Sequence, residues 1–530
     1  MKTLTGTSQL IRQILRRDRG RLAVWIAALA GFPIITANAF VELYATPSAR
    51  TDLVATFGSN PAYSALLGPI YDSSIGALTA WRIGVIGSVL VGLMAILTVI
   101  RNTRDEEESG RQELLGATVL GRHALLTAAL VVATGAGFVI GLLITAGLTG
   151  LGLEINGAVA YGAGVATLAA AFAAIGGTCA QLTSGGGAAR GVGVGVLGLT
   201  FMLRAVGDAT EASAAGWLSP IGWFTRLRPF AGEQWWVLAL PVGLAIVLGA
   251  TAFLLASRRD LGAGILPARA GPAEGPISLR NPLGLAWRLH RASLLGWSLG
   301  VMVLAALYGT VANNVSEIFE GNPQLADALA QLGGADRLTD TFFSFTAGVL
   351  ALFTGAYSIR TALRLRAEEE AIRAEPLLAT PTARWRWMGS HLMFAFLGPA
   401  LMLLIGGVVM GATYGSAVGD IGGQLMRVIP ITLAQLPAVW VLTGATAAIY
   451  GWLPRFTGVT WALLMVFLFL GQVGQILRFP DWLLNLSPFT HTAALTPDDL
   501  RLLPLLLLIA VVGILSGLGF FAFRRRDLVA

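Results

Sequence analysis

Long apolar runs recur along the whole chain and are separated by short polar segments. A helix of about 20 apolar residues is long enough to cross the hydrocarbon core of a bilayer. Short alternating strands, which are typical of outer-membrane barrels, do not occur in the pattern. The sequence therefore predicts an all-α polytopic membrane protein with about twelve transmembrane helices. They lie near 22–43, 79–100, 123–146, 157–181, 191–206 and 235–256, and near 293–313, 343–359, 391–413, 428–451, 457–477 and 502–523.

The polar segments between these runs occur twice. Residues 104–122, "RDEEESGRQELLGATVLGR", match residues 366–384, "RAEEEAIRAEPLLATPTAR", at ten of nineteen positions without a gap. "SRRDLG" at 257–262 is similar to "RRRDL" at 524–528, and "RGRLAVW" at 19–25 to "RASLLGW" at 291–297. Six spans in each copy make the repeat parallel. We expect membrane domains at 1–256 and 285–530, joined by a proline-containing linker at 257–284.

Charge gives the orientation and excludes several kinds of site. Only 12% of residues are charged and the mean hydropathy is +0.72, whereas soluble proteins have about 25% charged residues. With twelve spans, the arginine-rich segments all fall on one side, which the positive-inside rule assigns to the cytoplasm together with both termini. The net charge of +7 therefore comes from arginines that orient the protein in the membrane, and it does not indicate a nucleic-acid partner. Lys2 is the only lysine, which excludes a Walker A loop, and the single Cys179 excludes an intrachain disulfide.

The repeated acidic segments at 104–122 and 366–384 allow two interpretations. Glu107 and Arg111, like Glu369 and Arg373, are four residues apart, a spacing that supports a helix. They could be solvated helix ends that mark the membrane boundary. They could also be docking helices that present carboxylates and an apolar side chain to a basic groove on a cytoplasmic partner.

Other segments suggest helices at the membrane interface. Residues 8–20 and 281–293 precede the first span of each half, and the former has an apolar face, which predicts an amphipathic helix lying in the inner interface. Residues 216–236 and 481–500 mix tryptophan with proline and predict short interfacial or re-entrant helices on the outer side, or simply an aromatic belt at that boundary.

Few polar groups fall within the spans. Arg204, with Asp208 four residues later, could snorkel at the outer boundary or belong to a pathway or gate. Gln472 and Gln475 could line a pathway or bridge helices. The four histidines have no metal-ligand spacing, so we expect no metal, cofactor or catalytic site in this chain.

Six spans, an amphipathic start, an acidic helix between the second and third spans, and interfacial helices before the sixth resemble the membrane domain of ABC-2 type exporters. With "RDEEESGRQELLGATVLGR", "LSPIGWFTRLRPF" and "RRDLGAG", the fused twelve-span chain is similar to actinobacterial permeases described as exporters of polyketide antibiotics, the tetronasin type. The resemblance covers essentially the whole chain.

The resemblance implies a bacterial plasma-membrane permease that exports lipophilic drugs, antibiotics or lipids and is itself no enzyme. Energy comes from a separate ATPase, which carries ATP and Mg and is expected in two copies. The segments between the second and third spans of each half would be its coupling helices. Pro376 and Pro381, in place of Leu114 and Val119, predict a shorter or kinked helix in the second copy. The implied ATPase contacts are Glu106, Glu107, Glu108, Arg111, Glu113, Leu115, Glu368, Glu369, Glu370, Arg373, Glu375 and Leu377.

Two other functions are weighed against this one. An ion-gradient-driven secondary transporter also has twelve spans, but it needs coupling carboxylates near the bilayer midplane, and the acids here lie mostly in loops. A polytopic membrane enzyme needs catalytic acids or histidines gathered on one face. Dependence of transport on a second gene product separates the exporter from both.

Overall fold

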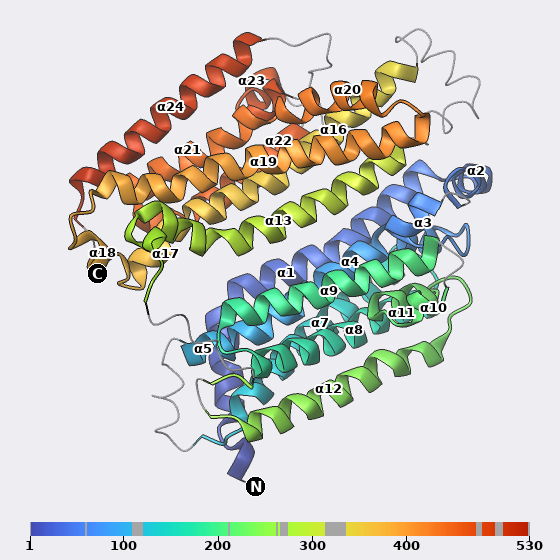
Figure 1. The fold of residues 1–530 in the computed structure, drawn as a ribbon. Helices are drawn as coiled ribbons and strands as arrows, with labels where there is room; N and C mark the ends of the chain where they lie inside the picture. Colours follow the sequence, from blue (N-terminus) through green and yellow to red (C-terminus); the bar gives the residue numbers. More distant parts are fainter. Residues whose placement is uncertain are drawn as a thin grey trace. The chain divides into compact units, whose positions relative to one another are not determined.

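The protein is all-helical in the residues that the structure, a computed structural model, describes (Figure 1). These residues are 2–58, 61–108, 120–209, 213–260, 263–265, 274–312, 335–472, 480–492 and 502–527. The chain divides into two compact units, Met1–Gly271 and Pro272–Ala530. The predicted fold class is confirmed.

Eleven helical segments in the described residues are long and apolar enough to cross a membrane. In the first unit they are α1 (Thr7–Leu43), α4 (Ile75–Arg101), α7 (Ala124–Gly150), α8 (Ile155–Leu182), α9 (Gly186–Ala209) and α12 (Ala239–Arg258). In the second unit they are α13 (Pro282–Ala312), α16 (Ala335–Ala362), α19 (Arg384–Val418), α20 (Ile421–Leu433) continued by α21 (Leu436–Trp452), and α24 (Leu502–Arg525). The span predicted at 457–477 coincides with α22 (Val459–Gln472), of which 14 residues are described.

Short helices occupy the two ends of each bundle (Figure 1). In the first unit α5 (Arg104–Glu108) lies at one end, and α2 (Pro47–Gly58), α3 (Pro61–Leu67), α10 (Ser213–Trp217) and α11 (Pro220–Leu227) lie at the other. In the second unit α17 (Arg364–Glu370) and α18 (Ala374–Leu378) lie at the end with the C-terminus, and α23 (Asp481–Leu484) lies at the other. Short helices were thus correctly predicted within 216–236 and 481–500.

The N-terminal segment is not a separate interfacial helix. Residues 8–20 are the first turns of α1, which runs without a break for 37 residues, and residues 282–293 are likewise the start of α13. Leu10, Ile14 and Leu22 are buried in the core of the first unit. At 1.5 Å per residue, α1 is about 55 Å long, well beyond the 30 Å hydrocarbon core. Most of the apolar face of the amphipathic start therefore packs on its own unit, whereas Leu15 is 47% exposed.

Glycine allows close helix packing at one crossing in each unit. A Cβ on Gly141 of α7 would lie 2.3 Å from the carbonyl oxygen of Gly162 on α8. A Cβ on Gly451 of α21 would lie 2.5 Å from the carbonyl oxygen of Gly519 on α24. Lipid tails are as apolar as the side chains, so the hydrophobic effect does not favour association of helices within a membrane. Close contacts such as these stabilise the bundle through van der Waals packing instead.

Candidate functional site

The polar segments that the sequence repeats gather at one end of each unit. In the first unit, the backbone N–H of His123 donates to Thr3 O at 3.0 Å, and that of Ile265 donates to Gln181 O at 3.3 Å. The start of the chain therefore lies beside the start of α7, and the segment after α12 lies beside the end of α8. Residues 257–265, predicted as part of the linker, belong instead to the first unit wherever they are described.

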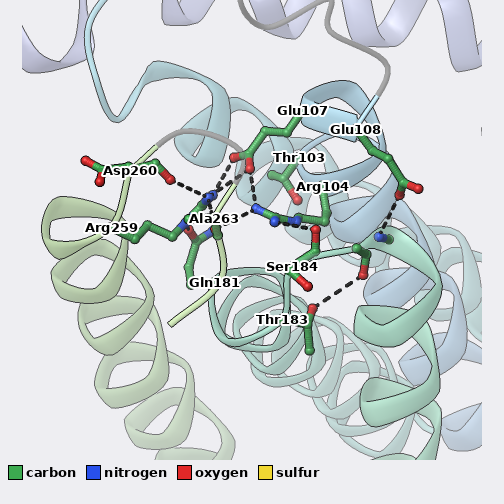
Figure 2. A network of polar contacts seen from close by, with 12 residues as sticks. Thr103, Arg104, Glu107, Glu108, Gln181, Thr183, Ser184, Arg259, Asp260 and Ala263 are labelled. Carbon is green, nitrogen blue, oxygen red and sulfur yellow. Dashed lines mark hydrogen bonds and ion pairs between the residues drawn. The ribbon is translucent and has the colours of Figure 1, made fainter. Parts of the chain in front are cut away.

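Glu107 is the centre of a buried ion-pair network in the first unit (Figure 2). Its carboxylate accepts hydrogen bonds from two guanidinium groups, those of Arg104 and Arg259. The three side chains are only 6%, 1% and 7% exposed, respectively. Arg104 also donates to the carbonyl oxygens of Ser184 at 2.6 Å and of Ala263 at 3.1 Å. The guanidinium groups thus have oxygen partners on three segments of the chain: α5, the end of α8 with the residues after it, and the residues after α12.

The second unit contains a matching network around Glu369. Arg526 donates to both carboxylate oxygens of Glu369, at 2.9 and 2.6 Å, and the Tyr450 hydroxyl donates to the same carboxylate at 2.8 Å. The side chains of Glu369 and Arg526 are 3% and 13% exposed. The guanidinium also lies over the rings of Tyr450 and Phe523, at 4.8 and 5.2 Å from their centroids.

The two networks join the same pair of sequence repeats. Glu107 and Glu369 occupy equivalent positions of the acidic segments, and Arg259 and Arg526 both precede the aspartate of the "RRD" repeats. We call the ion pairs Glu107–Arg259 and Glu369–Arg526 the clasps. Each clasp fixes the helix after the second span to the end of the last span of its unit, α12 or α24.

A further repeated arginine supports each clasp. Arg122 donates to the carbonyl oxygen of Arg259 at 3.4 Å, and its counterpart Arg384 donates to the carbonyl oxygen of Arg526 at 2.7 Å. Near the end of the fourth span, Gln181 accepts from Arg259 at 2.6 Å and Tyr450 donates to Glu369. The clasps therefore connect the second, third, fourth and sixth spans at one end of each unit.

The other predicted contact residues differ in exposure. Glu370 and Arg373 have side chains 60% and 63% exposed, and Glu108 and Glu375 are also exposed. Glu106 pairs with Arg17 and Glu368 with Arg364, and both are largely covered. Leu377 packs against the buried cluster that contains Trp387 and so is no free apolar knob. Arg111, Glu113 and Leu115 lie outside the described residues.

The prediction that Glu369 and Arg373 pair along one helix is wrong. The helix α17 ends at Glu370, and Ile372 has φ of 58°, in the left-handed region. Arg373 therefore lies near Glu368, at 3.9 Å, while Glu369 turns inward to Arg526. The predicted break in this segment exists, but it precedes Pro376, which lies in the first turn of α18, where proline is tolerated.

Arg204 does not snorkel to a boundary. It is fully buried, and it donates to the carbonyl oxygens of Ser64, Ala65 and Leu66 at the end of α3, at 2.5 to 3.3 Å. It also pairs with Asp208 at 3.4 Å. These contacts give it a structural role in attaching α3 to α9.

The predicted pathway residues Gln472 and Gln475 lie at and beyond the end of the described part of α22. Gln472 is the last described residue of α22, and Gln475 lies outside the described residues. Among the residues described, no three His, Cys, Asp or Glu side chains group to hold a metal ion.

Comparison with known proteins gives two matches. Residues 279–524 match the family model described as "Multidrug efflux system permease Rv1217c, C-terminal domain". The chain is 41% identical over 525 residues to the "Multidrug efflux system permease protein Rv1217c" of Mycobacterium tuberculosis (strain ATCC 25618 / H37Rv). The match covers 99% of this chain and 95% of that protein.

Proposed function

Because the chain belongs to the family of the multidrug efflux system permease Rv1217c, we propose that it is the membrane permease subunit of an ATP-driven drug exporter. The observation that carries this proposal is the full-length relationship, which includes both six-span halves. The apolar spans and the lack of a Walker lysine agree with a transport subunit whose ATP hydrolysis takes place elsewhere. The chain itself is then no enzyme.

The partner is a separate ATPase that carries ATP and Mg. Two equivalent clasps, one in each unit, support two docking sites and hence two ATPase copies for each permease. We infer that both docking sites face the cytoplasm, with both termini, because the repeated arginines gather there. The protein is then a multi-pass protein of the bacterial plasma membrane.

Exposure divides the acidic segments into two roles. Glu108, Glu370, Arg373 and Glu375 are exposed and are our candidates for direct ATPase contact. Arg111, Glu113 and Leu115 remain predicted contacts. Glu107 and Glu369 are buried in the clasps and act as positioning residues, because each holds its docking segment to α12 or α24. A movement of the ATPase would thus reach the last span of each unit directly.

Co-purification tests the docking sites. We expect an ATPase to co-purify with the tagged chain in about two copies, and we expect Glu108→Arg with Glu370→Arg to abolish this. Glu42→Arg with Asp52→Arg is the matched control, because it reverses two exposed carboxylates near the opposite end of the first unit. Retention of the ATPase by the first variant, or equal loss in both, would contradict the docking sites.

Transport assays test the energy source. Inverted vesicles that contain the permease and its ATPase should accumulate a lipophilic dye only with ATP. Accumulation by the permease alone, driven by an ion gradient, would show a secondary transporter instead. Competition by polyketide antibiotics in the same assay would test the finer resemblance to the tetronasin-type exporters.

A further inference from the structure

A basic hollow of about 440 Å³ lies in the first unit beside the clasp. Its walls come from α1, α4, α5 and α9, and the apolar Leu97 forms part of them. Four arginines from three long helices surround it, together with two carboxylates. These charged residues are Arg17, Arg21, Arg101, Arg190, Asp105 and Glu106.

Positive charge exceeds negative charge in the hollow. Arg190 pairs with Asp105 at 2.6 Å, and Arg17 pairs with Glu106. Arg21 and Arg101 have only Asp18 as a carboxylate partner among the described residues, at 2.9 and 3.2 Å. With Asp18 counted, the described residues of the hollow are four arginines and three carboxylates, a net charge of one positive.

The excess charge is held in place and remains accessible. Asp18 is 1% exposed and lies behind the arginines, where it also accepts from Asn102 at 3.2 Å. Arg21 and Arg101 are 30% and 44% exposed. Arg17 also lies 3.6 Å from Asp18, so three guanidinium groups share this buried carboxylate. Such a group can bind a second anion, because arginine offers several N–H donors to an oxyanion.

Three arginines of this hollow are not repeated in the second unit. The repeats align Arg17 with Leu289, Arg21 with Ser293 and Arg101 with Leu363. His290 occupies the position of Asp18, and it bonds His391 at 2.9 Å. Arg17, Arg21 and Arg101 are therefore specific to the first copy of the repeat and are not needed for the fold of both.

We propose that the hollow binds the phosphodiester headgroup of an anionic phospholipid. The hollow lies where α1 and α4 leave their apolar spans, at the end rich in arginine, which is the level of the headgroups. Basic pockets between helices on the cytoplasmic side bind such headgroups. Phosphate is the shared chemistry, and the proposed source is a lipid, because the hollow adjoins Leu97 and the apolar span of α4.

Lipid affinity of the purified permease alone tests the proposal, so the result does not depend on the ATPase or on transport. The probe is short-chain phosphatidylglycerol titrated into detergent-solubilised protein, with phosphatidylcholine as the neutral probe. We expect preference for phosphatidylglycerol and at least a fivefold loss of affinity in Arg21→Gln with Arg101→Gln. One arginine near an anionic lipid contributes about 1 kcal/mol, which is about fivefold.

Two further variants protect the test from a folding defect. Arg16→Gln with Arg19→Gln removes the same charge from exposed positions of α1 and should leave the affinity unchanged. Asp105→Asn removes a carboxylate from the hollow and should tighten phosphatidylglycerol binding severalfold, an effect that damage to the fold would not produce.

Four results would overturn the proposal. The first is equal affinity for the two lipids, and the second is an equal loss in the Arg16 and Arg19 control. The third is full displacement of phosphatidylglycerol by glycerol phosphate at equal concentration, which would assign the hollow to a free phosphate compound. The fourth is that Arg21→Gln with Arg101→Gln loses the co-purified ATPase but keeps its lipid affinity, which would assign the hollow to contact with the protein partner.

Discussion

The clasp of the second unit can be broken with little change of shape by Glu369→Gln. A glutamine side chain can still accept the hydrogen bond from the Tyr450 hydroxyl, but it leaves the charge of Arg526 without its carboxylate. The neighbouring Glu370→Gln is the matched control, since its side chain is 60% exposed and pairs with Arg366 on the helix surface. Two adjacent and chemically identical changes therefore test burial alone.

The expected cost follows from the exposure of the pair. Removing one partner of a buried ion pair lowers the free energy of unfolding by about 3–5 kcal/mol. Arg526 is 13% exposed and keeps its contacts with two aromatic rings, so we expect the lower end, about 3 kcal/mol. For a unit of about 250 residues this lowers the melting midpoint by about 6–12 °C. The control should cost about 0–1 kcal/mol, as exposed pairs do.

Thermal unfolding of the purified permease, followed by tryptophan fluorescence, measures these shifts. The double variant Glu369→Gln with Arg526→Met provides the sharper test, because it removes the unpaired charge as well. It should be more stable than the sum of the two single changes predicts, by at least about 1 kcal/mol. Additive losses, or a Glu369→Gln protein that melts like the control, would refute the buried clasp.

Three further predictions follow from the same structure and can be measured by the same melting assay. Glu107→Gln should destabilise more than Glu369→Gln, because the Glu107 carboxylate bonds two buried guanidinium groups whereas the Glu369 carboxylate bonds one; an equal or smaller loss would contradict the network. Gly141→Ala should lower the free energy of unfolding by about 1–3 kcal/mol, because its Cβ would lie 2.3 Å from a backbone oxygen of α8. Gly135→Ala on the same helix is the control: its Cβ would meet open space, so the change should be neutral or stabilising. Ile372→Gly should stabilise by about 1 kcal/mol, since φ is 58° there and the side chain is 55% exposed; a loss would show that the side chain contributes more than the strain.

Much of the fold was predictable because apolar length determines membrane spans. The spans were predicted from hydropathy, and each of eleven coincides with a long helix of the described residues. The amphipathic start of α1 was assigned to the interface because its polar face resembles that of a membrane-surface helix. The buried Leu10 and Ile14 show that part of the apolar face is covered by protein, and periodicity alone cannot distinguish such burial from contact with lipid.

The clasps were not predicted, although both of their parts were found. The acidic segments and the "RRD" segments were identified as separate repeats, and the carboxylates were all read as outward-facing. The pairing of Glu107 with Arg259 bridges 152 residues, and it depends on α12 ending beside α5. The available signal was that both motifs are duplicated and lie on one predicted side of the membrane. The break at Ile372 gave no signal, because isoleucine rarely adopts a left-handed conformation.

The distance along the chain between the two partners of each clasp has a consequence for synthesis. Arg259 follows Glu107 by 152 residues, and Arg526 follows Glu369 by 157. At about 5–20 residues per second, a ribosome takes about 10–30 s to make the intervening segment. During that time the carboxylate has no arginine from the last span, and the segment that carries it is not yet fixed. Each half therefore completes its clasp only when its sixth span has been made, so that the acidic segment of an unfinished half is not yet joined to the last span.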